Sequence, residues 1–306
     1  MGEPGQALMG SAMSGAPHPG AAAWDDGPAP SLTEAYAYCT RIARTHYENF
    51  TIASWMMPRS MRPHMHAIYA YARGADDLAD EAMDLAGLDR WEEELALAYE
   101  GVPHHPVFVA LADTVQRFEI PREPFLDLLL AFRSDVRFQG FETMDDLLGY
   151  ARYSANPVGR LVLYLFSYRD ERRQALSDSV CTGLQLANFW QDVAIDLAKG
   201  RIYLPRGDMV RFGVCVADLE GGRVTPGFVA LMRHECEVAR RLLVAGAELS
   251  QTVDGRLKRD VLLFAGGGLA IVRAIEAVGY DVFRRRPMLS KLDYVRLGWR
   301  ALGGRI

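Results

Sequence analysis

From Ser31 to the C-terminus, apolar residues recur at helical spacing, and few stretches alternate apolar and polar residues long enough to form a strand. Proline and glycine residues interrupt this pattern and set the boundaries between separate helices. The expected helices are 31–45, 61–80, 88–100, 106–118, 122–133, 143–151, 157–169, 172–197, 225–250, 255–279 and 289–302. No glycine-rich loop follows a strand, so a dinucleotide-binding fold is not supported. The pattern predicts one all-α helical bundle over residues 31–306.

The first 30 residues differ from the rest, because 18 of them are Gly, Ala or Pro and none is Lys or Arg. This composition predicts a disordered tail without the positive region of a secretory signal. Ser31 is expected to cap the first helix with Glu34. Four widely separated cysteines indicate reduced thiols in a cytoplasmic protein. No apolar run is long enough to span a membrane, and a net charge of −5 argues against a nucleic-acid partner.

A first acidic motif ends the helix expected at 61–80 and reads Arg73-Gly-Ala-Asp76-Asp77-Leu-Ala-Asp80. Asp76 and Asp80 are four residues apart and share one helix face with Arg73. Carboxylates at this spacing repel one another and destabilise a bare helix. A divalent cation is the simplest partner that would offset the repulsion.

A second polar stripe lies on an otherwise apolar helix. Gln185, Asn188, Asp192 and Asp196 are spaced by three, four and four residues, which predicts a single face lining a cavity inside the bundle. Two aspartate pairs on separate helices form a hard oxygen-ligand set that suits Mg²⁺, and the metal would neutralise a diphosphate leaving group. The alternative is that both motifs are solvated acidic surfaces with local salt bridges.

These residues resemble the squalene and phytoene synthase family of head-to-head prenyl diphosphate enzymes. Arg73-x-x-Asp76-Asp77-x-x-Asp80 is similar to the first aspartate-rich motif of that family, and Asn188-x-x-x-Asp192-x-x-x-Asp196 is similar to the second. The resemblance covers roughly residues 31–290. It implies an isoprenoid-synthase bundle around a central active-site cavity, with two or three Mg²⁺ ions. The metal ligands that it implies are Asp76, Asp80, Asn188, Asp192 and Asp196.

Within the family, three further stretches most resemble the bacterial hydroxysqualene synthases of squalene and hopanoid biosynthesis. They are residues 46–54, 153–159 and 279–287. Condensing squalene or phytoene synthases usually carry Ala-Gly-Thr-Val-Gly where this chain has Ala155-Asn156-Pro157-Val158-Gly159. They also usually carry Arg at the position of Gln191. Both departures indicate an enzyme that performs only the second ionisation.

The implied reaction converts presqualene diphosphate and water to hydroxysqualene and diphosphate, with no nicotinamide cofactor. The expected catalytic residues are the four metal-binding aspartates together with Asn188 and Tyr150. The expected substrate-binding residues are Tyr47, Asn49, Phe50, Arg73, Asp77, Gln185, Gln191, Lys199, Arg201, Tyr203 and Arg285.

Two other functions stay open at this point. One is a squalene or phytoene synthase that condenses two prenyl diphosphates, and the other is a non-catalytic scaffold of the same fold, against which the retention of all four aspartates argues. The expected partners are a prenyl diphosphate, the enzyme that makes presqualene diphosphate and the reductase that consumes hydroxysqualene. An oily product also predicts peripheral contact with the inner face of a membrane. Residues 266–268, all glycine, predict either close helix packing or room for an isoprenoid tail.

Overall fold

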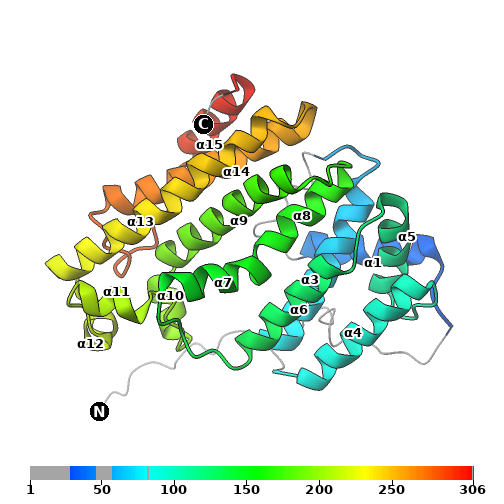
Figure 1. The fold of residues 1–306 in the computed structure, drawn as a ribbon, viewed down its shortest axis with the longest axis horizontal. Coiled ribbons are helices and arrows are strands. Elements are labelled where there is room, and N and C mark those ends of the chain that lie inside the picture. The colour runs from blue at the N-terminus through cyan, green and yellow to red at the C-terminus, as the bar shows by residue number, and fades with distance from the viewer. Residues whose placement is uncertain (1–27, 46–56, 81–82, 305) are drawn as a thin grey trace, which may run out of the picture.

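A computed structural model describes residues 28–45, 57–80, 83–304 and 306 of the chain (Figure 1). Every regular element in these ranges is a helix, which confirms the predicted all-α class. The α-helices are α1 (Leu32–Thr45), α3 (Arg62–Asp80), α4 (Leu85–Glu100), α5 (Pro106–Phe118), α6 (Glu123–Asp135), α7 (Met144–Ser154), α8 (Asn156–Leu165), α9 (Glu171–Gln191), α10 (Val193–Ala198), α11 (Arg206–Arg211), α12 (Val216–Glu220), α13 (Pro226–Gly246), α14 (Gly255–Ala277) and α15 (Lys291–Leu302). A short 3₁₀ helix, η1 (Ala247–Gln251), follows α13 directly.

The helix boundaries follow local sequence signals. The Ser31 hydroxyl accepts a hydrogen bond from the Glu34 amide at 3.4 Å, and the Glu34 carboxylate accepts one from the Ser31 amide at 2.9 Å. This pair is the predicted capping box of α1. Thr143 and Asp146 cap α7 in the same way. The short helices α11 and α12 were not among the predicted elements, because five or six residues are too few to establish an apolar periodicity.

The predicted continuous helix over 172–197 is wrong at one residue. Asp192 has φ −105° and ψ 12°, outside the α region, and it separates α9 from α10. Hydrogen bonds continue across the break, from the Asp192 amide to the Asn188 carbonyl and from the Asp196 amide to the Asp192 carbonyl, both at 2.9 Å. The helix is therefore interrupted at Asp192, but the backbone hydrogen bonds on both sides of the interruption are kept.

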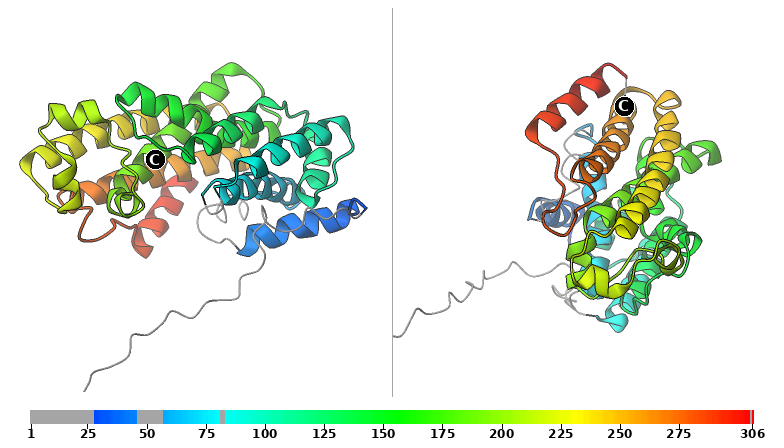
Figure 2. Two further views of the ribbon diagram at one scale, coloured as in Figure 1. Left: turned by 90° about the horizontal axis from the view of Figure 1, so that it is seen from below. Right: turned by 90° about the vertical axis from the view of Figure 1, so that its left-hand side faces the viewer.

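Two large apolar cores divide the molecule. One lies among α1, α3, α4, α5, α6 and α8, where Trp91 packs edge-on against Phe108 with ring centroids 4.7 Å apart. The other lies around α9 and α13, with Trp190 and Phe228 fully buried. Figures 1 and 2 show α9 running through the middle of the bundle, with α13 and α14 on one side and α7 and α8 on the other. The second acidic motif is thus carried by a central helix.

Glycines let the helices around α9 approach closely. A Cβ on Gly183 would lie 2.7 Å from Leu243 on α13, and one on Gly268 would lie 2.9 Å from the same leucine. Both distances are shorter than real Cβ contacts allow. Of the two interpretations of residues 266–268, Gly268 therefore supports close helix packing. None of the described helices is long and apolar enough to cross a bilayer.

Candidate active site

The first acidic motif lies at the C-terminal end of α3, where a single arginine holds two aspartates. An Arg73 guanidinium nitrogen lies 2.6 Å from the Asp77 carboxylate and another lies 3.4 Å from that of Asp76. The Asp77 side chain is buried, whereas that of Asp76 is 41% exposed. The arginine thus neutralises the buried aspartate and leaves Asp76 accessible to a ligand.

The second motif receives a cation from a distant loop. Arg286 forms a two-point ion pair with Asp192, with Nε 2.5 Å from Oδ1 and Nη2 2.9 Å from Oδ2. The buried Gln191 side chain fixes this loop, because its amide donates a hydrogen bond to the Pro287 carbonyl. Its Oε1 atom also accepts one from Arg286 at 3.4 Å. Gln191 and Asp192 therefore anchor the loop before α15 to the end of α9.

Asp196 lies one turn beyond Asp192 in a partly desolvated position. Burial, and to a smaller extent the negative charge of Asp192, raise the pKa of Asp196 to about 6. The positive charges of Lys199, Arg201 and Arg286 oppose this shift. The site thus holds two mutually repelling carboxylates within a ring of cations, an arrangement that favours a further positive ligand.

Three aromatic side chains pack together beside the second acidic motif. Phe189 and Tyr203 stack in parallel, with ring centroids 3.8 Å apart and planes 10° apart. Tyr150 on α7 lies at 6.4 Å from both rings, and its hydroxyl donates to the Asp135 carboxylate, 2.9 Å from the nearer oxygen. Burial and the charge of Asp135 raise the pKa of Tyr150, so the phenol stays protonated. Phe189 and Tyr203 pack on each other and are buried, so the cluster is part of the apolar core beside the motif.

A mostly apolar cavity of about 280 Å³ lies between α8, α9 and α14. Gln185 lines it, seven residues before Asp192, so the cavity begins about 10 Å along the helix axis from that carboxylate. Its aliphatic walls include Val158, Val162 and Leu184. A polar end with carboxylates and cations beside an apolar cavity matches a substrate that has an anionic head and a hydrocarbon tail.

Comparison with known proteins decides the family. The squalene/phytoene synthase family matches residues 43–293, which is most of the chain. The chain belongs to the squalene/phytoene synthase family. It is 31% identical over 271 residues to a phytoene synthase of Arthrospira platensis, covering 83% of this chain and 88% of that protein.

Two solved structures of the squalene/phytoene synthase family agree with this assignment. The squalene synthase HpnC from Alicyclobacillus acidocaldarius is 44% identical, with a TM-score of 0.78 and coverage of 81% of this chain and 95% of that one. A dehydrosqualene synthase in complex with a ligand is 29% identical, with a TM-score of 0.81 and coverage of 89% and 96%. The all-α isoprenoid-synthase fold is thereby shown.

The structure accounts for some of the predicted site residues more fully than for others. It brings together Arg73, Asp76 and Asp77 on α3, and separately Gln191, Asp192 and Asp196 with Tyr150 and Tyr203 nearby. Asn188 and Lys199 are exposed, and the Arg201 guanidinium lies 5.9 Å from the Phe138 ring centroid. Four predictions fall outside the described part of the chain: Tyr47, Asn49, Phe50 and the side chain of Asp80.

Three functional candidates escaped the sequence reasoning. Arg286 contacts Asp192, whereas the predicted Arg285 is exposed and lacks an ion pair to any described carboxylate. Asp135 accepts a hydrogen bond from the Tyr150 hydroxyl, and Asp260 lines the apolar cavity. The sequence prediction of Arg285 pointed to this loop, but nothing in the sequence indicated which of the three arginines at 284–286 reaches α9.

The donor set of the two motifs fits Mg²⁺. Carboxylate and amide oxygens are the hard ligands that this cation prefers, and Asp196 is a partly buried carboxylate whose pKa is raised by burial and by the charge of Asp192. Among the described side chains, no three carboxylate, histidine or cysteine groups lie together as a metal cluster. Arg73 and Arg286 lie against the aspartates and offset part of their charge.

Proposed function

We propose that the chain is a hydroxysqualene synthase, which converts presqualene diphosphate and water to hydroxysqualene and diphosphate. The observation that carries this proposal is that Gln191, an uncharged residue, is buried and hydrogen-bonded beside Asp192. Its amide is buried, donates to the Pro287 carbonyl and positions the Arg286 loop against Asp192. A neutral side chain thus occupies the position where condensing relatives usually carry an arginine.

A charge argument links this observation to the second-step reaction. Head-to-head condensation gathers the phosphates of two prenyl diphosphates in one site, whereas ionisation of presqualene diphosphate involves only one diphosphate. The number of cations needed is therefore smaller for the second step. Gln191 contributes no charge, and one loop arginine, Arg286, serves Asp192. The 44% identity to the squalene synthase HpnC supports a reaction on the route to squalene.

In this mechanism the cationic side chains bind the anionic head. Arg73, Arg201 and Arg286 would donate charge-assisted hydrogen bonds to the diphosphate oxygens. Asp76, Asp80, Asn188, Asp192 and Asp196 would hold Mg²⁺, which supplies charge neutralisation of the leaving group when bound. The bond between carbon and the diphosphate oxygen breaks with both electrons leaving on the diphosphate.

The remaining steps depend on the apolar part of the site. The cavity between α8, α9 and α14 holds the hydrocarbon chains and excludes bulk water while the cyclopropylcarbinyl cation rearranges. One water then forms the new carbon–oxygen bond and releases its proton. No reductant enters the balance.

The second candidate is a condensing synthase, and the phytoene synthase relative at 31% identity favours it. Product analysis separates the two functions. Purified protein with Mg²⁺ is given presqualene diphosphate or farnesyl diphosphate in separate reactions, without nicotinamide, and the extracts are read by mass spectrometry. We expect a C30 alcohol from presqualene diphosphate and no product from farnesyl diphosphate. Presqualene diphosphate or a C30 hydrocarbon formed from farnesyl diphosphate would establish the condensing function instead. Inactivity with every prenyl diphosphate would favour the scaffold.

A further inference from the structure

The last helix, α15, presents an apolar face to solvent. Leu292, Val295 and Trp299 are 67%, 55% and 73% exposed, and their spacing of three and four residues places them on one side of the helix. Met288, one turn earlier, is 65% exposed. The opposite side of α15 is already used, because Leu297 and Ala301 are buried and α15 packs on α14. The helix is therefore apolar on a second face beyond the one that its own fold covers.

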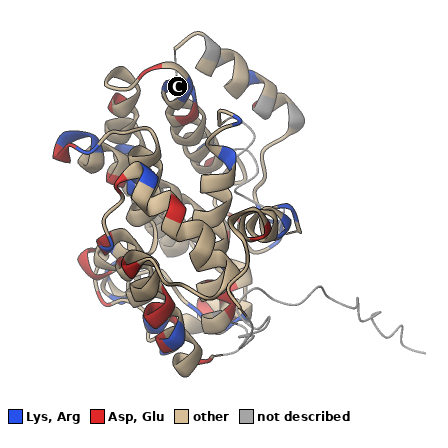
Figure 3. Ribbon diagram, turned by 90° about the vertical axis from the view of Figure 1, so that its right-hand side faces the viewer, with Lys and Arg blue, Asp and Glu red and all other residues tan. Residues whose placement is uncertain are grey.

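The same segment is strongly basic. Residues 284–306 contain seven Lys or Arg and one Asp, a net charge of +6, although the whole chain has a net charge of −5. Elsewhere, acidic and basic residues are spread over most helices (Figure 3). Asp293, the single acid of the segment, accepts hydrogen bonds from Ser290 at the start of α15. The segment is thus basic in sequence on an acidic protein, and its basic side chains that the structure describes are Arg284, Arg285, Arg286 and Arg296.

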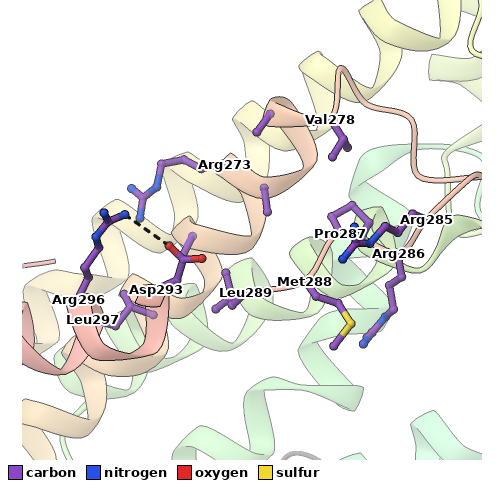
Figure 4. A pocket seen from close by; sticks show the side chains of 13 residues that line it. Arg273, Val278, Arg285, Arg286, Pro287, Met288, Leu289, Asp293, Arg296 and Leu297 are labelled. Atoms are coloured by element: carbon purple, nitrogen blue, oxygen red, sulfur yellow. Dashed lines mark ion pairs between the residues drawn. The ribbon is translucent and has the colours of Figure 1, made fainter. Parts of the chain in front are cut away.

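Arginines also surround a groove between α14 and α15. The groove has a volume of about 590 Å³, and Arg273 and Arg296 lie on one side of it, with Arg285 and Arg286 on the other (Figure 4). Its lining includes the apolar Ala270 and Leu297 and one carboxylate, Asp293, which lies 3.9 Å from Arg296. Cations around an apolar floor suit a phosphate attached to an alkyl chain.

From this juxtaposition we propose that α15 and residues 284–290 form a docking surface for a bilayer containing anionic phospholipid. Leu292, Val295 and Trp299 would enter the boundary between headgroups and acyl chains, while the surrounding cations contact phosphate. A protein partner is less well matched, because the exposed apolar residues stand in a segment with a net charge of +6, the composition of an interfacial helix. The proposal concerns the surface alone and does not depend on which reaction the site performs.

The position of the surface gives it a consequence for the active site. Arg286, which holds Asp192, is two residues before Met288 in the same loop. Docking would therefore place the Asp192 end of the site beside the bilayer. An amphiphilic diphosphate and an oily product would exchange there over a short distance.

Vesicle flotation of the full chain tests the proposal. Vesicles of phosphatidylglycerol and phosphatidylcholine in equal amounts are compared with vesicles of phosphatidylcholine alone, at low and high salt. We expect the protein to float with the anionic vesicles only, and less so at high salt. The tryptophan emission should shift to the blue on binding, and Trp299→Phe should lose most of that shift. Absence of flotation with both vesicle types would overturn the proposal.

Matched variants test whether α15 is the surface that binds the vesicles. Trp299→Glu and Val295→Glu should each weaken vesicle binding about tenfold, because each removes an inserted side chain and adds a negative charge. Val210→Glu is the control, since Val210 on α11 is 79% exposed and the charge change is the same. Melting temperature and turnover of detergent-dispersed substrate should stay unchanged in all three. Equal weakening by Val210→Glu would contradict the assignment. So would a Trp299-dependent dimer in sedimentation with unaltered flotation, which would identify a self-association face.

Discussion

The Arg286 guanidinium spans both carboxylate oxygens of Asp192, 94 residues earlier in the chain, with N–O distances of 2.5 and 2.9 Å. This ion pair joins the loop before α15 to the break between α9 and α10. The parallel two-point geometry fixes the orientation of the guanidinium as well as its charge. In the proposed mechanism the same arginine donates to the diphosphate, so the pair sets the geometry of the anionic end of the site.

Replacement of Arg286 should therefore damage catalysis more than replacement of its neighbour. Arg286→Ala is expected to lower kcat/KM by about 10²-fold, a loss typical of one donor aimed at developing charge. Arg285→Ala is the matched control, because Arg285 is exposed and lacks an ion pair to any described carboxylate, and its effect should be several-fold smaller. Steady-state kinetics with presqualene diphosphate measures both. Equal losses in the two variants would show that the arginines act only through their general charge.

The aspartates should make activity depend on a divalent cation. Chelation with EDTA is expected to abolish turnover and added Mg²⁺ to restore it, while Asp192→Asn lowers kcat by about 10³-fold or more. Asp178→Asn is the control, since Asp178 lies on α9, 14 residues before Asp192, and is paired with Arg160 at 2.6 Å. It should lower the melting temperature without a comparable loss of turnover. Full activity in EDTA would exclude the proposed role of the metal.

Tyr150 and Asp135 should be energetically coupled. The Tyr150 hydroxyl donates to the Asp135 carboxylate inside a part-buried aromatic cluster, at 2.9 and 3.0 Å. Tyr150→Phe is expected to lower the free energy of unfolding by about 1–3 kcal/mol. In a double-mutant cycle with Asp135→Asn, the combined loss should be smaller than the sum of the two single losses. Additive losses in denaturant titrations would show that the two groups do not depend on one another.

A buried glutamate should make stability depend on pH. Glu235 on α13 is fully buried, its carboxylate oxygens lack a hydrogen-bond partner among the described residues, and burial raises its pKa to about 8. The folded state thus keeps a proton that the unfolded state releases near its ordinary pKa of 4.5. The stability that this protonated group contributes is fully present below pH 4.5 and is lost as the pH rises to about 8. Within that window the free energy of unfolding falls by up to about 1.4 kcal/mol per pH unit.

Glu235→Gln should remove this slope and raise stability relative to the natural chain at pH 8. Glu237→Gln, two residues along on the exposed side of α13, should leave the slope in place. Urea unfolding between pH 5 and pH 8 measures the free energy of unfolding of each variant. This range lies between the ordinary pKa of 4.5 and the raised pKa of about 8. Parallel pH profiles for the natural chain and Glu235→Gln would contradict the account.

The sequence carried most of the fold because helical periodicity and helix breakers are local signals. Ser31 with Glu34 identified the start of α1, and the apolar stripes identified most of the long helices. The break at Asp192 was not predictable, because the flanking residues 186–190 and 193–195 read as uninterrupted helix. The helices α11 and α12 are too short to show a period.

The site was less accessible to sequence reasoning than the fold. Residues on one helix face, such as Asp76 with Arg73, can be placed by spacing alone. Contacts between distant segments cannot, since the choice of Arg286 over Arg285 depends on how the loop is held by Gln191 and Pro287. Asp135, Asp260 and Glu235 were missed for the same reason, because the contact of Asp135 with Tyr150 and the burial of the other two carboxylates exist only after the helices are packed.

The central claim is that a carbon–oxygen bond to diphosphate breaks and that water captures the resulting cation. The most direct measurement is turnover of presqualene diphosphate in water labelled with oxygen-18, in the presence of Mg²⁺ and without a reductant. We predict a rearranged C30 alcohol that carries the label from solvent, with unlabelled diphosphate released. An unrearranged alcohol that keeps the oxygen of the substrate would show cleavage at phosphorus. Either that product or an unlabelled C30 hydrocarbon would contradict the claim.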